Sequence, residues 1–590
     1  MNRNQINNLL HDKKIESEAV VKSVDFDLHS LYFLPLGGSG EFGINLNLYH
    51  CNGKWILVDL GMSFEELPGS NVILPDISFI KTLDPKDILG LIITHGHEDH
   101  IGAIPYLIKE IRTPIYAGPF TSSLIKNKLL ENKVKAKLHT VEIGKEFSLD
   151  PFKIKLINVT HSIPESSMVY IKTPLGNIMH TGDWKFDTTP VLDNATDYDS
   201  LKKAAEDKIL LAVCDSTNAI SEASQFSETD VKNELDKVIS KIKGNRIVIG
   251  CFSSNIARID SCARLAKKHH RKVALVGRSM HKIKEAASEH GYFQNLPEFL
   301  SEKDGNTTNR NEILFICTGS QGEINSGLKR MSEHDHPRVK LEAGDTVIVS
   351  AKTIIGRERE VAEMLNNFAK NDINVITYSE EHPIHASGHP VRNDLREFYS
   401  MIRPKFSIPV HGERIHQNAH ADLLHSLKIK SLVPSNGDIV KISPHEIKIV
   451  DHIEVSKSVL DGKAIIPYTG RTILERRWLE NGCIFVSIVV ESDGKFKLVT
   501  SFCGICEKED PIKQKIRQRI KSVVIALSHN DKQVQKTLVS VIRKTVKYAM
   551  FELRSKDPAI FVYATILGKP EEKQDLNIEN LEEDTDILID

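Results

Sequence analysis

The sequence has few cysteines for its length, and it lacks long apolar runs. Eight cysteines spread over 590 residues do not form a disulfide framework, so a small disulfide-stabilised scaffold is excluded. No apolar stretch approaches the roughly 20 residues that a membrane-spanning helix needs. The first twenty residues are polar and lack the apolar core of a signal peptide. We therefore expect a soluble, cytoplasmic protein that is not attached to a membrane.

The chain also lacks a marked excess of charge of either sign, with 77 basic and 79 acidic residues and a formal net charge of −2. This balance excludes a wholly basic protein that wraps nucleic acid, but it allows a local basic groove. The one closely spaced cysteine pair is Cys503 and Cys506, in "FCGIC". Without a second such pair, we expect two partly buried thiols in a reducing cytosol rather than a redox or metal site.

The sequence contains several structural regions. From about residue 30, short β-branched runs alternate with turn residues, and Asn52-Gly53 in "CNGK" predicts a hairpin. Few helical segments interrupt this part, so we expect two sheets packed face to face with helices outside. After about residue 200, strand and helix patterns alternate, which predicts a parallel, Rossmann-like sheet. Its strands end in polar turns such as "CFSSN", "CTGSQGE" and "SAKTIIGRE", which favours a shared site at the carboxyl ends of the strands.

Three histidines and two acids crowd into residues 95–100, "HGHEDH", directly after an apolar run. His95 and His97 are two positions apart, so in an extended loop their imidazoles fall on one side and can bind one ion. Asp99 and His100 are adjacent, point differently and suit a second ion. Imidazole with carboxylate fits Zn²⁺ or Mn²⁺ better than Cu⁺ or Ca²⁺. A lone histidine is usually an ordinary surface or core residue, but chance occurrence of this whole pattern is on the order of 10⁻² or less.

Three more candidate residues each follow a predicted strand. "ILVDLG" supplies Asp59, "NVTHSIPES" supplies His161, and "IMHTGDWKFD" supplies Asp183, whose carboxylate could bridge two cations. In this order the motifs resemble those of the metallo-β-lactamase superfamily. The resemblance implies that one ion is bound by His95, His97 and His161, that the other is bound by Asp99 and His100, that Asp183 binds both, and that Asp59 supports the ligands from behind.

The superfamily includes lactamases, thioesterases, glyoxalases and nucleases, so it leaves the substrate open. "AVCDSTNA" with Asp215, "HASGHPVRND" with His389 and "IPVHGERIH" with His411 resemble the three additional motifs of the β-CASP nucleases. Because it has a histidine at position 411, this last motif resembles that of the RNA-processing branch of the family, in which the histidine is a further metal ligand. "GGSGEFG", "LPDISFI", "FSSNIARI", "GRSM" and "TGSQGE" resemble the bacterial ribonuclease J family within that branch, from about residue 30 to 550.

This resemblance implies an α/β fold: a metallo-β-lactamase αββα sandwich with an inserted Rossmann-like β-CASP domain and a small α/β C-terminal domain. We expect six segments along the chain. They are an N-terminal extension (1–28), the first part of the lactamase domain (29–205), the β-CASP domain (206–370), the second part of the lactamase domain (371–454), the C-terminal domain (455–560) and an acidic tail (561–590).

The resemblance also implies an activity: a two-metal 5'-to-3' exoribonuclease with some endoribonuclease activity, acting in messenger RNA decay and ribosomal RNA maturation. It would bind two Zn²⁺ or Mn²⁺ ions per subunit and single-stranded RNA, preferably with a 5'-monophosphate. Asp183 would orient the attacking water, and His389, steadied by Asp215, would protonate the leaving 3'-oxygen. We expect a homodimer or homotetramer; protein partners in RNA decay are not identified by the sequence.

Substrate contacts are expected at two places. The "HASGH" loop, made of His385, Ala386, Ser387, Gly388 and His389, offers backbone N–H groups that could cradle a phosphate. Ser253, Ser254, Arg278 and Ser320 either contact the RNA strand or only cap turns.

Two other functions remain open on the sequence. A small-molecule hydrolase of the thioesterase or lactamase type would explain the metal motif but not the inserted domain. An inactive scaffold for RNA processing would explain the domains, although every expected metal ligand is present.

Overall fold

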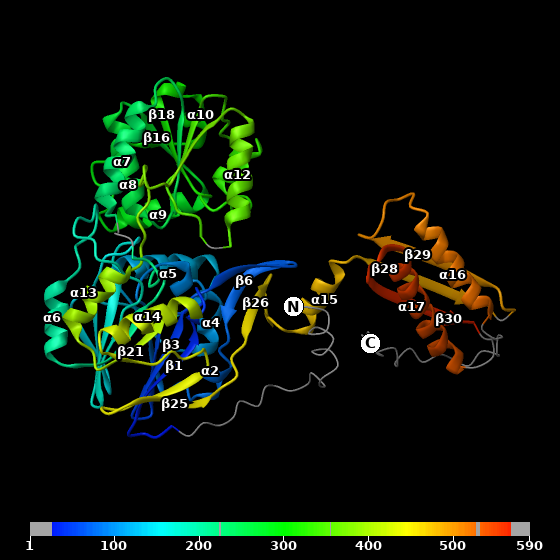
Figure 1. The fold of residues 1–590 in the computed structure, drawn as a ribbon, viewed down its shortest axis with the longest axis horizontal. Helices are drawn as coiled ribbons and strands as arrows, with labels where there is room; N and C mark the ends of the chain where they lie inside the picture. Colours follow the sequence, from blue (N-terminus) through cyan, green and yellow to red (C-terminus); the bar gives the residue numbers. More distant parts are fainter. Residues whose placement is uncertain (1–25, 223–225, 355, 492, 527–531, 568–590) are drawn as a thin grey trace. The chain divides into compact units, whose positions relative to one another are not determined.

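The computed structural model describes residues 26–222, 226–354, 356–491, 493–526 and 532–567 (Figure 1). The expected N-terminal extension lies almost wholly outside these residues, as does the acidic stretch from residue 571 onward. The chain forms two compact units, which are described separately below. One contains residues 21–63 and 73–456, and the other contains residues 1–20, 64–72 and 457–590. Among the described residues, no helix has both the length and the apolar character that a membrane crossing requires.

Two large sheets form the base of the first unit. The eight-stranded sheet has the order β25-β24-β1-β3-β4-β7-β8-β9 and the seven-stranded sheet has the order β10-β11-β12-β13-β14-β21-β23. The strands of the first are β1 Leu31–Gly37, β3 Leu46–Cys51, β4 Lys54–Val58, β7 Ile88–Ile92, β8 Ile115–Ala117, β9 Leu138–Thr140, β24 Asp438–Ile442 and β25 Ile447–His452. The strands of the second are β10 Glu146–Leu149, β11 Phe152–Asn158, β12 Ser167–Thr173, β13 Gly176–His180, β14 Ile209–Asp215, β21 Phe406–Val410 and β23 Lys430–Ser431.

The two sheets pack face to face, as the alternating apolar pattern predicts. Phe33, Tyr49 and Val58 of the first sheet share one buried cluster with Ile154 and Ile171 of the second. The outer face of the seven-stranded sheet is covered by α6 (Tyr198–Glu206), α13 (Arg392–Ile402) and α14 (Arg414–Ser426), which contribute buried residues to a second cluster around Trp184. The remaining short elements of this part are β2 Ser39–Gly40, β22 Gly412–Glu413, α2 Ser78–Thr82, α3 Glu98–Ile101, α4 Ile104–Ile111 and α5 Pro119–Glu131.

A six-stranded parallel sheet forms the rest of this unit, with the order β17-β16-β18-β15-β19-β20. Its strands are β15 Ile247–Gly250, β16 Lys272–Val276, β17 Phe299–Leu300, β18 Ile313–Cys317, β19 Thr346–Val349 and β20 Asn374–Thr377. Helices α7 (Glu228–Lys241), α8 (Ile256–Lys268) and α9 (Arg278–Glu289) bury apolar residues on one face. Helices α11 (Gly327–Ser332) and α12 (Glu358–Lys370) bury theirs on the other, and Figure 1 shows α7 and α12 on opposite sides of the sheet. The predicted Rossmann-like domain is confirmed; α10 (Glu302–Thr307) and a 3-10 turn (Arg310–Glu312) complete it.

Two strands lie on the other side of the expected domain boundaries. β14, which the sequence places in the inserted domain, pairs with β13 and β21 in the seven-stranded sheet. β20, which the sequence places in the lactamase domain, pairs with β19 in the parallel sheet. Both strands are short apolar runs that follow or precede helices, and such runs look the same in either sheet.

The second unit contains two small sheets. A four-stranded sheet has the order β27-β26-β6-β5, with β5 Ser63–Leu67, β6 Ser70–Pro75, β26 Lys457–Asp461 and β27 Ala464–Pro467, and α15 (Arg471–Leu479) follows it. A three-stranded sheet has the order β29-β28-β30, with β28 Cys483–Val490, β29 Phe496–Cys503 and β30 Ala559–Ile566. Helices α16 (Ile512–Ala526) and α17 (Lys532–Arg554) bury one face of this sheet.

Two details of the C-terminal region differ from expectation. β30 runs to Ile566, so ordered structure extends past the expected start of the tail at residue 561. Cys503 is exposed rather than partly buried, and its register partner on β28 is Cys483, whereas Cys506 packs against the core of this domain. Cys503 therefore faces a cysteine 20 positions away in the sequence rather than its neighbour in "FCGIC".

Candidate metal centre

The metal motif lies where the chain leaves β7 and enters α3. His97 is the N-cap residue of α3, with φ −73° and ψ 155°, so the backbone is extended at this residue. Asp99 and His100 lie in the helical turn that follows. This change from extended to helical backbone directs the two pairs of side chains to different neighbours.

The first group of candidate ligands consists of His95, His97, His161 and Asp183. His97 Nδ1 lies 3.0 Å from His95 Nε2 and 3.0 Å from His161 Nε2. Asp183 Oδ2 lies 3.9 Å from the Nε2 atoms of both His95 and His161. Three imidazole nitrogens and one carboxylate oxygen thus converge on one point.

The second group consists of Asp99, His100, Asp183 and His411. Asp183 Oδ2 lies 3.2 Å from His100 Nε2 and 3.3 Å from His411 Nε2. Asp99 Oδ2 lies 3.5 Å and 3.7 Å from the same two nitrogens. The same oxygen of Asp183 therefore lies near the ligand atoms of both groups, and it would be available to an ion in either one.

These separations fit divalent metal ions. A tetrahedral ion with ligand bonds of 2.0–2.1 Å separates its ligand atoms by about 3.3–3.4 Å. The distances between candidate ligand atoms in the two groups range from 3.0 to 3.9 Å, and this range includes that value. In addition, Asp183 Oδ1, the other oxygen of this carboxylate, is buried without a hydrogen-bond partner in the described part of the chain, so the carboxylate has a second oxygen that could bind an ion. The residues present therefore fit two ions.

The electrostatics of the two groups differ. Burial lowers the pKa of His97 to about 4 and holds the pKa values of His95 and His161 well below 6.5, so all three rings are neutral and able to bind metal. Burial also acts against a charge on His100, but Asp183, Asp99 and Asp59 outweigh it and hold its pKa well above 6.5. The second group thus carries an excess of negative charge that attracts protons, and a divalent cation would satisfy the same charge.

Four histidines point their Nε2 atoms toward the other ligand atoms, and in each of them Nδ1 has a polar partner that orients the ring. His100 Nδ1 lies 2.7 Å from Asp59 Oδ2, so Asp59 contacts the ring on the side away from the other ligand atoms. His161 Nδ1 donates to Gly388 O over 2.6 Å. His95 Nδ1 lies 3.0 Å from Thr94 Oγ1, and His411 Nδ1 lies 3.0 Å from Asn45 Oδ1. Such partners fix the tautomer and orientation of metal-binding imidazoles.

Sequence reasoning missed Thr94 and Asn45. Thr94 also donates to Asp59 over 2.9 Å, and it directly precedes the metal motif, so its position was a usable signal. Asn45 donates to the backbone oxygen of Asp99 over 3.0 Å. It is 366 residues away from its partner His411, and nothing in the local sequence marks it.

A third group brings Asp215 and His389 next to Asp183. His389 Nδ1 donates to Asp215 Oδ2 over 2.9 Å and lies 3.8 Å from Asp183 Oδ2. Burial opposes the charge on His389, but Asp215, with a smaller contribution from Asp183, raises its pKa to about 9. The side chain thus lies beside the Asp183 carboxylate, and the two acids favour its protonated form.

The "HASGH" loop lies directly against the metal centre through Gly388. A Cβ atom at Gly388 would lie 2.6 Å from His161 Cε1, so this close approach requires glycine. Ser387 Oγ accepts from Asn218 Nδ2 over 2.8 Å, and Ala386 is buried. Burial, followed by the charges of Arg258 and Lys185, lowers the pKa of His385 to about 3, so this ring is neutral.

The four weaker candidates all lie at the carboxyl-terminal edge of the parallel sheet. Ser253 and Ser254 follow β15, Arg278 begins α9 after β16, and Ser320 follows β18. Arg278 is exposed and the two serines after β15 are half-buried. Ser320 is only 1% exposed, and its Oγ has no partner among the described residues, so in this conformation it is not accessible to an RNA strand.

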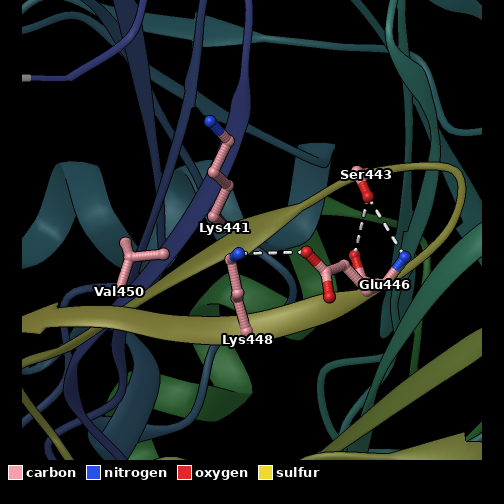
Figure 2. Close-up of a pocket in the computed structure, with 5 residues that line it drawn as sticks. All are labelled: Lys441, Ser443, Glu446, Lys448 and Val450. Atoms are coloured by element: carbon pink, nitrogen blue, oxygen red, sulfur yellow. Dashed lines mark hydrogen bonds and ion pairs between the residues drawn. The ribbon is translucent and has the colours of Figure 1, made fainter.

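The hollow in Figure 2 is a different place. It lies on the β24–β25 hairpin and is lined by Lys441, Ser443, Glu446, Lys448 and Val450. Lys448 Nζ pairs with Glu446 Oε1 over 3.0 Å, and Ser443 Oγ donates to Glu446 O over 3.0 Å. Lys441 Nζ pairs with Asp27 Oδ2 over 3.2 Å, and the hollow contains none of the candidate site residues.

Comparison with known protein families agrees with the fold and the site. Residues 40–214 match the metallo-beta-lactamase superfamily, residues 244–368 match "Ribonuclease J, beta-CASP domain", and residues 380–434 match the Zn-dependent metallo-hydrolase RNA specificity domain. The sandwich, the paired ligand groups and these matches define a metal-dependent nuclease of the metallo-β-lactamase superfamily. The chain belongs to the ribonuclease J family.

Individual relatives support this assignment. The chain is 34% identical to Ribonuclease J of Sinorhizobium meliloti over 91% of this chain and 97% of that protein. It is 34% identical to Ribonuclease J 1 of Streptococcus pyogenes over 89% of this chain and 96% of that protein. A solved structure of a protein of unknown function from Enterococcus faecalis superimposes with a TM-score of 0.51 at 16% identity, over 70% of this chain and all of that one, and shows similarity of fold alone.

Proposed function

We propose that this chain is a 5'-to-3' exoribonuclease with additional endoribonuclease activity, selective for single-stranded RNA that carries a 5'-monophosphate. The observation that carries the proposal is the 2.6 Å hydrogen bond between His161 Nδ1 and Gly388 O. It fixes a loop with backbone N–H groups, suited to a phosphate, immediately beside the ligand groups. A terminal phosphate bound there leaves little chain between the 5' end and the centre, which favours stepwise removal of nucleotides.

The candidate ligands suit two Zn²⁺ or Mn²⁺ ions, because imidazole nitrogen and carboxylate oxygen are ligands that both ions accept. Held by the two groups, such ions would lower the pKa of a water molecule and neutralise the charge of the phosphodiester. Asp183 Oδ2 lies near ligand atoms of both groups, so this carboxylate would orient the attacking water.

His389 acts on the leaving group. Its Nδ1 is held by Asp215, which leaves proton donation toward the 3'-oxygen to Nε2. The ring lies against His161, with centroids 5.1 Å apart, so it is close enough to the ligands to serve the same phosphate. Asp215 keeps this ring oriented and stabilises its protonated form.

The test uses one RNA sequence prepared with a 5'-monophosphate, a 5'-triphosphate or a 5'-hydroxyl group, incubated with Mn²⁺ or Zn²⁺. We expect mononucleotides to be released fastest from the monophosphate form, with slower internal cuts in the others. Equal inertness toward all three would refute nuclease activity, and equal rates on all three would refute the proposed end preference. A small-molecule hydrolase would instead turn over a thioester or a β-lactam, for which we expect no activity.

We further propose that the chain acts in the cytoplasm, in messenger RNA decay and ribosomal RNA maturation, as a homodimer or homotetramer. The face of the C-terminal three-stranded sheet that lies opposite α16 and α17 supports self-association, because Val499 and Tyr563 are 67% and 57% exposed there and Phe485 stacks on Phe561. Light scattering of the purified chain measures the state directly, and a monomer at all concentrations would contradict it.

A further inference from the structure

The "HASGH" loop is anchored at both ends, and each end is held by a different domain. At its rear end, Gly388 O accepts from His161, and His389 donates to Asp215, both in the two-sheet domain. At its front end, Ile384 O accepts from Ser350 Oγ over 2.6 Å and from Arg258 Nη1 over 3.1 Å. Ser350 follows β19 and Arg258 lies on α8, so the front anchor belongs to the parallel-sheet domain.

Arg258 is the centre of the front anchor. Its side chain is 1% exposed, and the same Nη1 also donates to Ser350 O over 2.8 Å. Its Nε and Nη2 donate to the two carboxylate oxygens of Glu228 over 3.1 and 3.0 Å. This planar, two-bond pairing fixes the guanidinium in orientation as well as in position, which a lysine ammonium at the same place would not do.

The network continues from Glu228 back toward the metal centre. The Glu228 backbone N–H donates to Asp187 Oδ2 over 3.0 Å, and Asp187 forms a buried ion pair with Lys185 at 3.1 Å. The Asp187 backbone N–H donates to Thr160 Oγ1 over 3.1 Å, and Thr160 directly precedes His161. The contacts therefore form a closed ring: from His161 through Gly388 and the loop to Arg258, and from Arg258 through Glu228 and Asp187 back to Thr160.

We propose that Arg258 is a positioning residue that sets the distance between the front of this loop and the metal centre, and thereby the preference for a 5'-monophosphate. The proposal rests on the proposed function for the substrate and its end group. Arg258 touches neither the ligands nor the reacting atoms. Loss of the front anchor lets His385 and Ala386 shift, while His161 still holds Gly388 and the metal ligands stay in place. Small displacements of groups that hold a substrate cost large factors in rate.

Two variants test the front anchor, and they remove different parts of its hydrogen bonding. Ser350→Ala removes the hydroxyl that bonds Ile384 O but leaves the Arg258–Glu228 pair intact. Arg258→Lys keeps the charge and removes the two-bond geometry. The matched control is Ser261→Ala, because Ser261 is also 1% exposed and lies one turn from Arg258 on α8, but its Oγ has no partner in the described structure.

The measurement is the ratio of kcat/KM for 5'-monophosphorylated RNA to that for the same RNA with a 5'-hydroxyl group, together with the metal content of each variant. We expect the ratio to fall about tenfold in Arg258→Lys and about threefold in Ser350→Ala, with metal content and 5'-hydroxyl turnover unchanged. Ser261→Ala should match the wild type. If Arg258→Lys does not fold, Ser350→Ala and its control still decide the question.

The outcomes separate the two proposals. A wild type that degrades RNA without end preference would refute the proposed specificity and remove the basis of the positioning role. A different outcome is a wild type that prefers the monophosphate, while the variants keep the same kcat/KM ratio or lose activity on both RNAs equally. That result would refute the role of Arg258 and leave the proposed function standing.

Discussion

The metal centre and the "HASGH" loop lie side by side, yet they are built in different ways. All the candidate metal ligands come from strand ends, loops and the short helix α3 of the two-sheet domain, with four of them between residues 95 and 100. The loop is held between that domain at Gly388 and the parallel-sheet domain at Ile384. Under the proposed function, bond cleavage would depend on the two-sheet domain, whereas the choice of RNA end would depend on how the two domains are held together. Substitutions in the two places should therefore have different signatures.

The largest effect is expected at the metal centre itself. His97→Ala removes a neutral imidazole that lies 3.0 Å from two other ligand atoms. We expect activity on every RNA to fall by more than about 10⁴-fold, with loss of bound metal, because both ions are needed to activate water and hold the phosphate. Activity assays and metal analysis check this, with circular dichroism as the control for folding. Full turnover by the variant would contradict the assignment of His97.

His389→Ala should lower the rate by about 10²–10⁴-fold while metal content stays at the wild-type level. The reason is that His389 lies outside the group around His97 and outside the group around His100, although it forms a third group with Asp183 and Asp215. This result would separate proton transfer from metal binding. A loss of metal comparable to that in His97→Ala would instead make His389 a ligand.

Gly388→Ala tests the contact between the loop and the centre. The added Cβ would lie 2.6–2.7 Å from ring atoms of His161, so the loop or the ring must shift. We expect a loss of about 10–100-fold in activity together with weaker metal binding, which is typical when an outer partner of a metal-binding histidine is displaced. Gly356→Ala is a control for the steric contact, because no atom of the described residues lies within 4 Å of a Cβ there, although Gly356, unlike Gly388, has a positive φ. Equal activity of the Gly388 and control variants would show that the contact is not needed.

The smallest effect is expected at Glu165, outside both regions. Burial raises the pKa of this carboxyl group from 4.5 to about 7, while its oxygen accepts from the backbone N–H of Phe120. The folded state holds this proton more tightly than the unfolded state, so the stabilisation is complete below pH 4.5 and is lost as pH rises through 7. The glutamine in Glu165→Gln does not titrate. We therefore expect the melting temperature of the variant minus that of the wild type to be about 2–4 °C larger at pH 8 than at pH 5. Activity should be unchanged; a pH-independent difference would refute the shift in pKa.

The sequence was informative where chemistry is concentrated in short motifs. The residues from His95 to His100 indicate a metal site, because so dense a cluster of histidine and acidic residues has few explanations other than metal binding. Asp183 and His161 are candidates because each follows a predicted strand. The resemblance to a known family added His411 and the loop. The structure brings all of these residues together.

The sequence was uninformative where a contact joins ordinary residues that are far apart. Asn45, Arg258 and Ser350 are common residue types, and their partners lie 366, 126 and 34 positions away. Hydrogen bonds of this kind depend on how the domains pack, which no local pattern records. The same reason explains β14 and β20, whose apolar runs fit either sheet until the neighbouring strands are known.

The most direct test is the location of bound ions in crystals of the chain soaked in Mn²⁺, measured by anomalous scattering. We predict two peaks, one among His95, His97 and His161 and one among Asp99, His100 and His411, with Asp183 between them. A single peak, or ions outside these two groups, would contradict the account of the centre.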